Sequence, residues 1–338
     1  MHVLGIDIGS LEYHTHLLDA ADPTRSGGAI DAFANSPKGH HRLAAWLEKH
    51  GARAESTLVV LEATGVYWQG CAHHLHRLGF AVSVVNPAQI KFYAKSTLRR
   101  GKTDRMDAEV IAQYGATMRP KPWKPAEQAL EAIQFLVRER EAVVALLTQE
   151  KGRLHALRHR HEADEVVVRL VEERISLLEG QLEALERALK GRFAASASLQ
   201  RDLELLTSVP GFGFVAAATV LAETNGFATL ESGRQLAAYA GLSPAPRQSG
   251  TSGGYARISK VGNPRLRRIA YMAAVGATRS RSGLRAFYLG LKQRGKPSKV
   301  ALVALARKLL CVGMAVVKSG KPYDPGYTRP AEAAPASP

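Results

Sequence analysis

HVLGIDI, residues 2–8, is a short apolar run that ends in Asp7-Ile8 and is followed by Gly9. Residues 14–20 alternate in polarity and predict a second strand, so the two runs are expected to form a hairpin. Residues 28–34 could supply a third strand. The chain therefore begins a β-sheet whose first strand carries a carboxylate near its end.

Helices alternate with further strands after this hairpin. SPKGHHRLAAWLEKHG begins with a capping residue, Ser36, and ends in glycine, which is typical of a helix. TLVVLE (57–62) predicts a buried strand before a helix over 66–78. A strand over 81–86 precedes a helix that Pro87 opens. This alternation predicts an α/β domain.

A long helical region follows a Pro- and Lys-rich linker at 119–125. Its second half has heptad spacing, whereas Arg140 and Lys151 fall in the seam of the first half. The hairpin turn is expected around Asp164. An antiparallel pair within one chain and a dimerisation arm both remain open, and the regular heptad favours a partner chain. The heptad residues are Val168, Val171, Ile175, Leu178, Leu182, Leu185 and Leu189.

The C-terminal part predicts mainly helices, with basic ones over 264–278 and 298–317. A turn containing Gly211 and Gly213 joins two earlier helices and resembles a helix-hairpin-helix element, whose exposed N–H groups suit a phosphate. A simple helical turn is the alternative. The expected segments are an α/β domain (1–120), a linker with coiled coil (121–200), a second domain (201–325) and a disordered tail (326–338).

Composition narrows the class of protein. The 338 residues contain 46 Lys plus Arg against 30 Asp plus Glu, a formal charge of +16 that favours a polyanionic partner. An apolar fraction of 46% excludes a wholly disordered chain. We expect no apolar run long enough to span a membrane, and no secretory signal. Two cysteines, Cys71 and Cys311, cannot form a disulfide framework, so a reducing cytoplasm is expected.

Positive charge is concentrated in two places. No acidic residue occurs between Glu231 and Asp324, and a one-signed stretch of this length favours a phosphate-binding surface over a merely solubilising one. A second basic cluster runs directly into Asp104. The residues expected to bind nucleic acid are Lys91, Lys95, Arg99, Arg100, Lys102, Arg105, Gly211, Gly213, Arg247, Arg257, Lys260, Arg265, Arg267 and Arg268.

Four carboxylates can converge at one end of the predicted sheet. Asp7 and Glu62 each lie at the end of an apolar strand, and Asp104 and Asp107 are spaced i, i+3 on a helix. Taken singly, each could be a hairpin or capping residue. Together, acids so placed require cations, and oxygen ligands select Mg²⁺ or Mn²⁺. Two such ions would suit an in-line phosphoryl displacement.

These motifs resemble a known family. GIDIGS, LEATGVYW and KTDRMDAEVIA are similar to the RuvC/RNase H-like domain of the DEDD transposases, the recombinases named after insertion sequence one-ten, which include the pilin-gene invertase Piv. The family's catalytic and metal-binding acids fall on Asp7, Glu62, Asp104 and Asp107, with the D-x-x-D spacing intact. The resemblance covers nearly the whole chain.

The segment LAAYAGLSPAPRQSGTSGGYARISKVGNPRLRRIAYMAA resembles the C-terminal signature of the same family. The family's nucleophilic serine falls on Ser249. The residues alone leave Ser243, Ser252 and Ser259 open as well, with Ser252 the second choice, because a flexible linker is the ordinary interpretation of such a loop.

The resemblance implies a transposase and site-specific DNA recombinase that cuts and rejoins DNA through a covalent 5′-phosphoserine link. It further implies a structured bridge RNA that pairs with donor and target DNA, and a dimer or tetramer with an active site shared between protomers. Two alternatives remain. One is a metal-dependent nuclease or junction resolvase of RNase H fold in which Ser249 is structural. The other is a non-enzymatic nucleic-acid scaffold.

Overall fold

The structure is a computed structural model that describes residues 2–19, 28–63, 65–97, 104–125, 127–245 and 257–326, without the side chains of Asp104 and Arg105. The chain divides into two compact units, residues 1–125 and 126–338.

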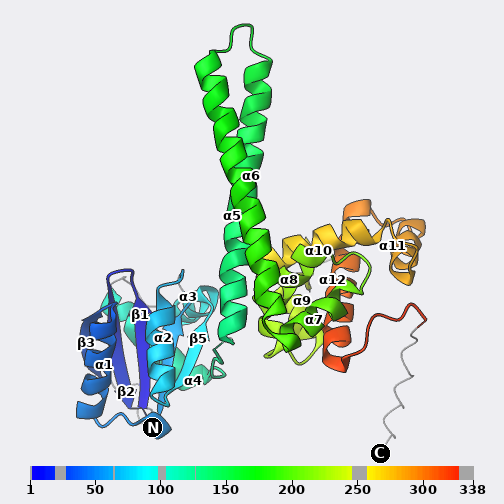
Figure 1. Cartoon of the computed structure of the whole chain (residues 1–338). Coiled ribbons are helices and arrows are strands. Elements are labelled where there is room, and N and C mark those ends of the chain that lie inside the picture. The colour runs from blue at the N-terminus through cyan, green and yellow to red at the C-terminus, as the bar shows by residue number, and fades with distance from the viewer. Residues whose placement is uncertain are drawn as a thin grey trace, which may run out of the picture. The chain divides into compact units, whose positions relative to one another are not determined.

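The first unit is built on a five-stranded mixed sheet in the order β3-β2-β1-β4-β5 (Figure 1). The three strands at one side form an antiparallel meander, and β4 and β5 continue the sheet parallel to β1. The predicted α/β domain of RuvC/RNase H type is confirmed. The strands are β1 (His2–Ile8), β2 (Glu12–Asp19), β3 (Ala29–Ala34), β4 (Thr57–Glu62) and β5 (Ala81–Val85).

Helices cover both faces of this sheet. On one face, α1 (Pro37–Lys49) and α2 (Trp68–Arg77) bury a core that includes Leu4 and Ile6 of β1. On the other, α3 (Pro87–Ser96) and α4 (Asp104–Met118) bury Val3 of β1 and Val60 of β4. Successive side chains of a strand point to opposite faces, so β1 contributes to both cores. The predicted Ser36 cap accepts a bond from the Gly39 N–H at 3.3 Å.

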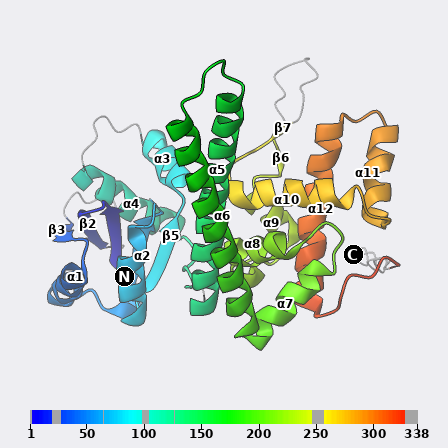
Figure 2. The same cartoon turned by 45° about the horizontal axis from the view of Figure 1, so that its top comes forward.

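The second unit begins with two long helices, α5 (Gln128–Arg158) and α6 (Glu165–Ala194), which pack as an antiparallel pair (Figures 1 and 2). Asp164 caps α6, at the predicted turn. The polar residues of the seam have partners on the facing helix: Arg140 pairs with Glu186 and Lys151 with Glu179, each at 2.7 Å. The heptad therefore packs within one chain, and a role in dimerisation stays a prediction.

Shorter helices form the rest of the second unit around one apolar core (Figure 2). The predicted basic helices are present as α10 and α12, whereas α11 was not anticipated from the sequence. A two-stranded ladder precedes α10. These elements are α7 (Ala197–Thr207), α8 (Phe214–Thr224), α9 (Gly233–Tyr239), β6 (Pro244–Ala245), β7 (Arg257–Ile258), α10 (Pro264–Ala277), α11 (Gly283–Gln293) and α12 (Ser298–Ser319), with single 3₁₀ turns at Ala54–Ser56 and Asn225–Phe227.

By length and composition, α12 could cross a membrane, so the expectation that no such segment exists is wrong. The packing nevertheless identifies α12 as a core helix. Leu305, Leu309 and Leu310 are at most 1% exposed and lie within the apolar cluster of the second unit. An apolar helix is what the centre of a helical domain requires.

Candidate functional site

Asp7 and Glu62 lie next to each other in the sheet, at the carboxyl ends of two parallel strands. The register of β1 and β4 pairs Gly5 with Val60 and Ile6 with Leu61, so Asp7 and Glu62 are the next residues on adjacent strands. Because side chains alternate, both fall on the face that carries Val60, the face covered by α4. Both are half-buried.

Two glycines seat α4 directly on this face. A Cβ on Gly5 would lie 2.3 Å from both the Ala108 carbonyl oxygen and the Ala112 nitrogen, and a Cβ on Gly115 would lie 2.6 Å from Val60. Gly5 is thus in backbone contact with the first half of α4. The same approach places residue 115 near Val3, at the amino end of β1. Helix α4 therefore runs opposite to β1.

This direction puts the amino end of α4 at the carboxyl end of β1. Asp107 is half-buried and directly precedes Ala108, which contacts Gly5, two residues before Asp7. Asp104 begins the helix one turn earlier; its side chain lies outside the described residues. The structure thus brings Asp7, Glu62 and Asp107 to one edge of the sheet. Gly5 makes this possible through its contact with α4, which the sequence did not indicate.

Asn35 ties together the two loops that follow the carboxylate-bearing strands. Its Nδ2 donates to the carbonyl oxygens of Gly9 and Tyr67, both at 3.0 Å, and its backbone N–H donates to Leu11 at 2.7 Å. Its Oδ1 lies 3.2 Å from Nε2 of His40. Since Oδ1 can only accept, His40 donates there. Asn35 is a positioning residue that no motif in the sequence had indicated.

The chemistry of this edge suits a hard divalent cation. Carboxylate oxygens are the ligands that Mg²⁺ and Mn²⁺ take in proteins. Among the described side chains, no group of three or more His, Cys, Asp and Glu is already arranged as a metal site. The side chain of Asp104 is not among the described residues. The carboxylates that are described, Asp7, Glu62 and Asp107, are of the ligand type that such a cation takes.

The basic cluster that precedes Asp104 in the sequence is described only in part. Lys91 and Lys95 are both exposed and lie on α3, which packs against α4. The remaining residues predicted here, Arg99, Arg100 and Lys102, and the side chain of Arg105, lie outside the described residues.

The predicted nucleophile belongs to a segment anchored at both ends. Ser249, together with Arg247 and Ser252, lies outside the described residues. The chain enters the segment from Ala245 and leaves it at Arg257, and these two residues pair in the β6–β7 ladder. Lys260 donates its N–H to the Gly241 carbonyl at 3.1 Å, which continues the pairing.

A buried carboxylate, Glu223 on α8, fixes the base of this segment. Its side chain is 1% exposed and accepts two bonds from Arg138, at 2.9 and 3.2 Å. Asn263 donates to it at 2.7 Å and also caps α10 through the N–H groups of Arg265 and Leu266. Glu223 thereby connects α5, α8 and the start of α10.

The three arginines of α10 are engaged within the protein. Arg265 donates to Glu141 at 2.9 Å, and Arg268 donates to the other oxygen of the same carboxylate. Arg267 donates to the carbonyl oxygens of Ala240 and Lys260, both at 3.1 Å. A phosphate would have to compete with these partners, so their predicted role in nucleic-acid binding stays a prediction.

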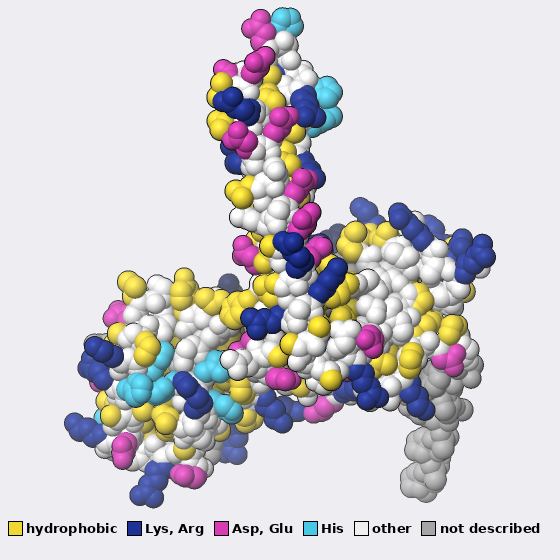
Figure 3. Space-filling view, viewed as in Figure 1, with side chains coloured by type: hydrophobic (Ala, Val, Ile, Leu, Met, Phe, Trp, Pro, Cys, Tyr) yellow, Lys and Arg dark blue, Asp and Glu magenta, His cyan; other side chains and the backbone are white. Residues whose placement is uncertain are grey.

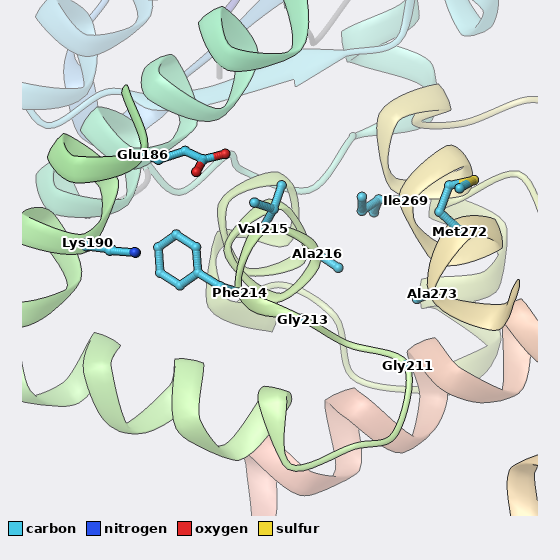
Figure 4. A pocket seen from close by; sticks show the side chains of 10 residues that line it. All are labelled: Glu186, Lys190, Gly211, Gly213, Phe214, Val215, Ala216, Ile269, Met272 and Ala273. Carbon is cyan, nitrogen blue, oxygen red and sulfur yellow. The ribbon is translucent and has the colours of Figure 1, made fainter. Parts of the chain in front are cut away.

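The glycine turn before α8 borders an open cavity of about 460 Å³ (Figure 4). Gly211, with φ of +105°, packs against the Ala273 carbonyl of α10, and Gly213 precedes the first residue of α8. Lys190 points toward the ring of Phe214, with its Nζ 6.0 Å from the ring centre. The turn is therefore accessible and has a cation beside it. Phosphate binding at this turn stays a prediction.

Taken together, these elements define a class: a carboxylate-bearing α/β unit joined to a basic helical unit, as in enzymes that act on DNA. Residues 4–159 match a family model described as a DEDD transposase of the IS110 type, and residues 203–289 match one described as a transposase of the IS116/IS110/IS902 family.

The chain is 30% identical over 324 residues to the pilin gene-inverting protein of Moraxella lacunata, which covers 95% of this chain and 97% of that protein. It is 25% identical to the transposase for insertion sequence element IS1328 of Yersinia enterocolitica, over 95% and 98% of the two chains. The chain belongs to this family of IS110-type transposases and DNA invertases, enzymes that cut and rejoin DNA.

A solved structure of Thermus thermophilus RuvC with a Holliday junction substrate aligns with 36% of this chain and 99% of that one, at 15% identity and a TM-score of 0.29.

Proposed function

We propose that the chain is a site-specific recombinase of an insertion sequence in which Ser249 attacks a DNA phosphodiester. The serine Oγ forms a bond to phosphorus, the bond to the 3′ oxygen breaks, and the serine proton ends on that 3′ hydroxyl. The 5′-phosphoserine link conserves the bond energy, so the reverse step rejoins a strand. The observation that supports the proposal most is the meeting of Asp7, Glu62 and the amino end of α4 at one sheet edge.

In this proposal Asp7, Glu62, Asp104 and Asp107 hold the divalent cations, Mg²⁺ or Mn²⁺. When bound, such ions stabilise negative charge that develops on the phosphate. The chain's own residues position the acids: Gly5 admits α4, and Asn35 fixes the loops after β1 and β4. Exposed cations of the same unit, Lys91 and Lys95 among them, hold the DNA backbone.

A structured bridge RNA is proposed to select donor and target DNA. This part of the proposal comes from the family resemblance. The positive charge of +16 supports a polyanionic partner but does not distinguish RNA from DNA.

A homodimer or tetramer is proposed to complete the active site. Several large apolar residues of the α5–α6 pair point away from its seam: Leu146, Leu170 and Leu177 are 51%, 45% and 61% exposed. Exposed leucines on an otherwise well-packed helical pair suit contact with a second copy. We propose that they contribute to the oligomer, and that the assembly works in the cytoplasm at the nucleoid.

The decisive experiment detects the covalent link. Purified protein, labelled DNA carrying both recombination sites and the RNA encoded beside the gene are mixed with Mg²⁺ and quenched in denaturant. We expect a protein–DNA adduct that Ser249→Ala abolishes. The matched control Ser252→Ala, a serine three residues away, keeps the adduct.

Three other results would each contradict the proposal in a different way. Nicking without an adduct, unchanged in Ser249→Ala, would indicate a metal-dependent nuclease. Loss of the adduct in Ser252→Ala, but not in Ser249→Ala, would identify Ser252 as the nucleophile. Recombination at the wild-type rate in both Asp7→Ala and Ser249→Ala would indicate a non-enzymatic scaffold.

A further inference from the structure

The cations of the stretch between Glu231 and Asp324 divide into two groups in the structure. The arginines of α10 are used internally, two by Glu141 and one by backbone carbonyls. The cations further along the chain have no ion pair within the described ranges. An external polyanion meets less competition there than on α10.

We define the α11 surface as six cations on α11, beside its start, and on the turn and first residues that lead into α12. All six are exposed, and none contacts a carboxylate among the residues that the structure describes. Figure 3 shows Lys and Arg side chains over this end of the second unit, whereas both signs of charge are mixed along α5 and α6. The six are Arg281, Arg285, Lys292, Arg294, Lys296 and Lys299.

Packing holds α11 so that its cations point outward. Leu284 is 2% exposed, and Phe287 packs against the core with Lys308 of α12 4.4 Å from its ring centre. Arg285 and Lys292 are seven residues apart on the opposite, exposed face. Seven residues span about 10 Å of helix, which is about the rise of three base pairs along a duplex axis.

The connecting turn adds cations without adding acids. The Nζ of Lys292 lies 2.9 Å from Oγ of Ser298, and Arg294 donates to the Gly290 carbonyl at 3.1 Å. These local bonds keep two long side chains beside the turn. Each retains further N–H groups that a phosphate oxygen can accept from.

The α11 surface lies away from the anchor of the Ser249 segment. That anchor is at the amino end of α10, where Asn263 binds Glu223. The α11 surface begins beyond the other end of α10, and a helix of this length spans about 20 Å. It therefore contacts a different part of a bound polymer.

We propose that the α11 surface binds the phosphate backbone of a nucleic-acid duplex at a distance from the bond that is cut. The inference rests on the proposed function only in that the chain acts on nucleic acid. None of its six cations lines either of the two described cavities, which suits a polymer better than a small phosphate. Phe287 and Tyr288 are both half-buried, and Lys308 lies over the Phe287 ring, which leaves little aromatic face for stacking with unpaired bases.

The test compares two triple variants that lose the same charge. Arg285→Ala/Lys292→Ala/Lys299→Ala removes half of the α11 surface. The control, Lys38→Ala/Arg42→Ala/Lys49→Ala, removes three exposed cations of α1 in the first unit. Binding of the full-length proteins to a DNA duplex of about 20 base pairs, and to an RNA duplex of the same sequence, is measured from about 50 to 200 mM salt.

We expect the first variant to bind at least one of the duplexes about 10-fold more weakly or worse at 100 mM salt, with a salt slope lower by about two to three. The control is expected to keep the wild-type slope. Loss on the DNA arm alone assigns the surface to DNA, and loss on the RNA arm alone assigns it to RNA; either result supports the proposal.

The duplex-binding experiment distinguishes an error in the α11 proposal from an error in the proposed function. If the wild-type protein binds neither duplex, both are overturned. If it binds and the first variant keeps the wild-type slope, or both triple variants lose affinity equally, only the α11 surface is overturned. Loss of binding to phosphatidylglycerol vesicles with unchanged duplex binding would instead assign the surface to membranes and overturn it.

Discussion

Gly5 controls how closely α4 approaches the sheet, and through it where Asp107 lies. Because a Cβ there would meet backbone atoms of Ala108 and Ala112 at 2.3 Å, the helix must move if a side chain is added. We expect Gly5→Ala to lower the free energy of unfolding by about 1–3 kcal/mol. Urea denaturation measures the loss, and the adduct assay measures the accompanying fall in activity.

The controls for Gly5 are two helical glycines. Gly152 on α5 and Gly180 on α6 have open space where a Cβ would be built. Alanine at either position should raise stability by about 0.5–1 kcal/mol, since alanine has the higher helix propensity. A Gly5→Ala protein as stable and active as the wild type would contradict the close seating of α4.

The variant Glu223→Ala tests whether one buried carboxylate holds in place the residues next to the Ser249 segment. Removing it leaves Arg138 and Asn263 without their acceptor. Breaking a buried pair on one side costs about 3–5 kcal/mol, and we expect the lower end for Glu223→Ala, because Arg138 is 33% exposed. The surface control Glu179→Ala, whose partner Lys151 is 54% exposed, should cost about 0–1 kcal/mol. Equal losses would contradict this account.

His40 predicts a pH dependence of stability. Burial, together with the neighbouring His74 and His41, lowers the pKa of His40 to about 4. The unfolded chain therefore binds more protons than the folded one between about pH 6.5 and 4, and stability falls as pH drops through that window. The full shift corresponds to about 3 kcal/mol.

The variant His40→Gln keeps a donor for Asn35 but does not titrate. Its stability should fall less than that of the wild type between pH 7 and pH 5, as followed by thermal unfolding at each pH. If the stability of the variant fell with pH as steeply as that of the wild type, groups other than His40 would control the loss of stability in acid.

At the scale of elements, most strands and helices follow from local pattern. The apolar runs, the Ser36 cap and Pro87 predicted the order of the first unit, and strand-end position alone marked Asp7 and Glu62. Gly5 and Glu223 could not be predicted, because their contacts come from residues about a hundred and about forty to eighty-five positions away. Helix α11 was missed because its pattern is short and lies between basic stretches.

The α5–α6 pair shows that heptad spacing alone does not indicate whether a helix packs within its own chain or against a partner chain. The same spacing serves an intrachain hairpin and a partner chain, and the paired residues Arg140 and Glu186 show that the seam is filled internally. The proposal of an oligomer rests instead on Leu146 and Leu177, which face away from the seam.

We expect Leu146→Ser/Leu177→Ser to shift the protein toward monomer in sedimentation velocity while its far-UV circular dichroism stays unchanged, because exposed leucines add little to the hairpin itself. Exposed Arg169→Ser is the control on the same helix pair. An unchanged sedimentation coefficient in the leucine variant would place the oligomer contact elsewhere.

At the scale of the whole molecule, the chain combines a carboxylate cluster in the first unit with a stretch between Glu231 and Asp324 that contains no acid. The first unit gathers carboxylates at a sheet edge, and the second carries most of a one-signed cationic surface. Binding a DNA strand, which is a polyanion, requires cations along its backbone, and cleaving it in this way requires divalent ions at the bond that breaks.

The central claim is that Asp7, Glu62 and the start of α4 meet around one divalent-cation site. Fe²⁺ substituted for Mg²⁺, with ascorbate and peroxide, cleaves a backbone next to the bound ion, and mass spectrometry locates the cuts. The account predicts cuts near residues 7, 62 and 104–107 together, suppressed by excess Mg²⁺ and by Asp7→Asn, but not by Asp31→Asn on β3. Cuts at only one of these segments, or cuts that persist unchanged in Asp7→Asn, would contradict it.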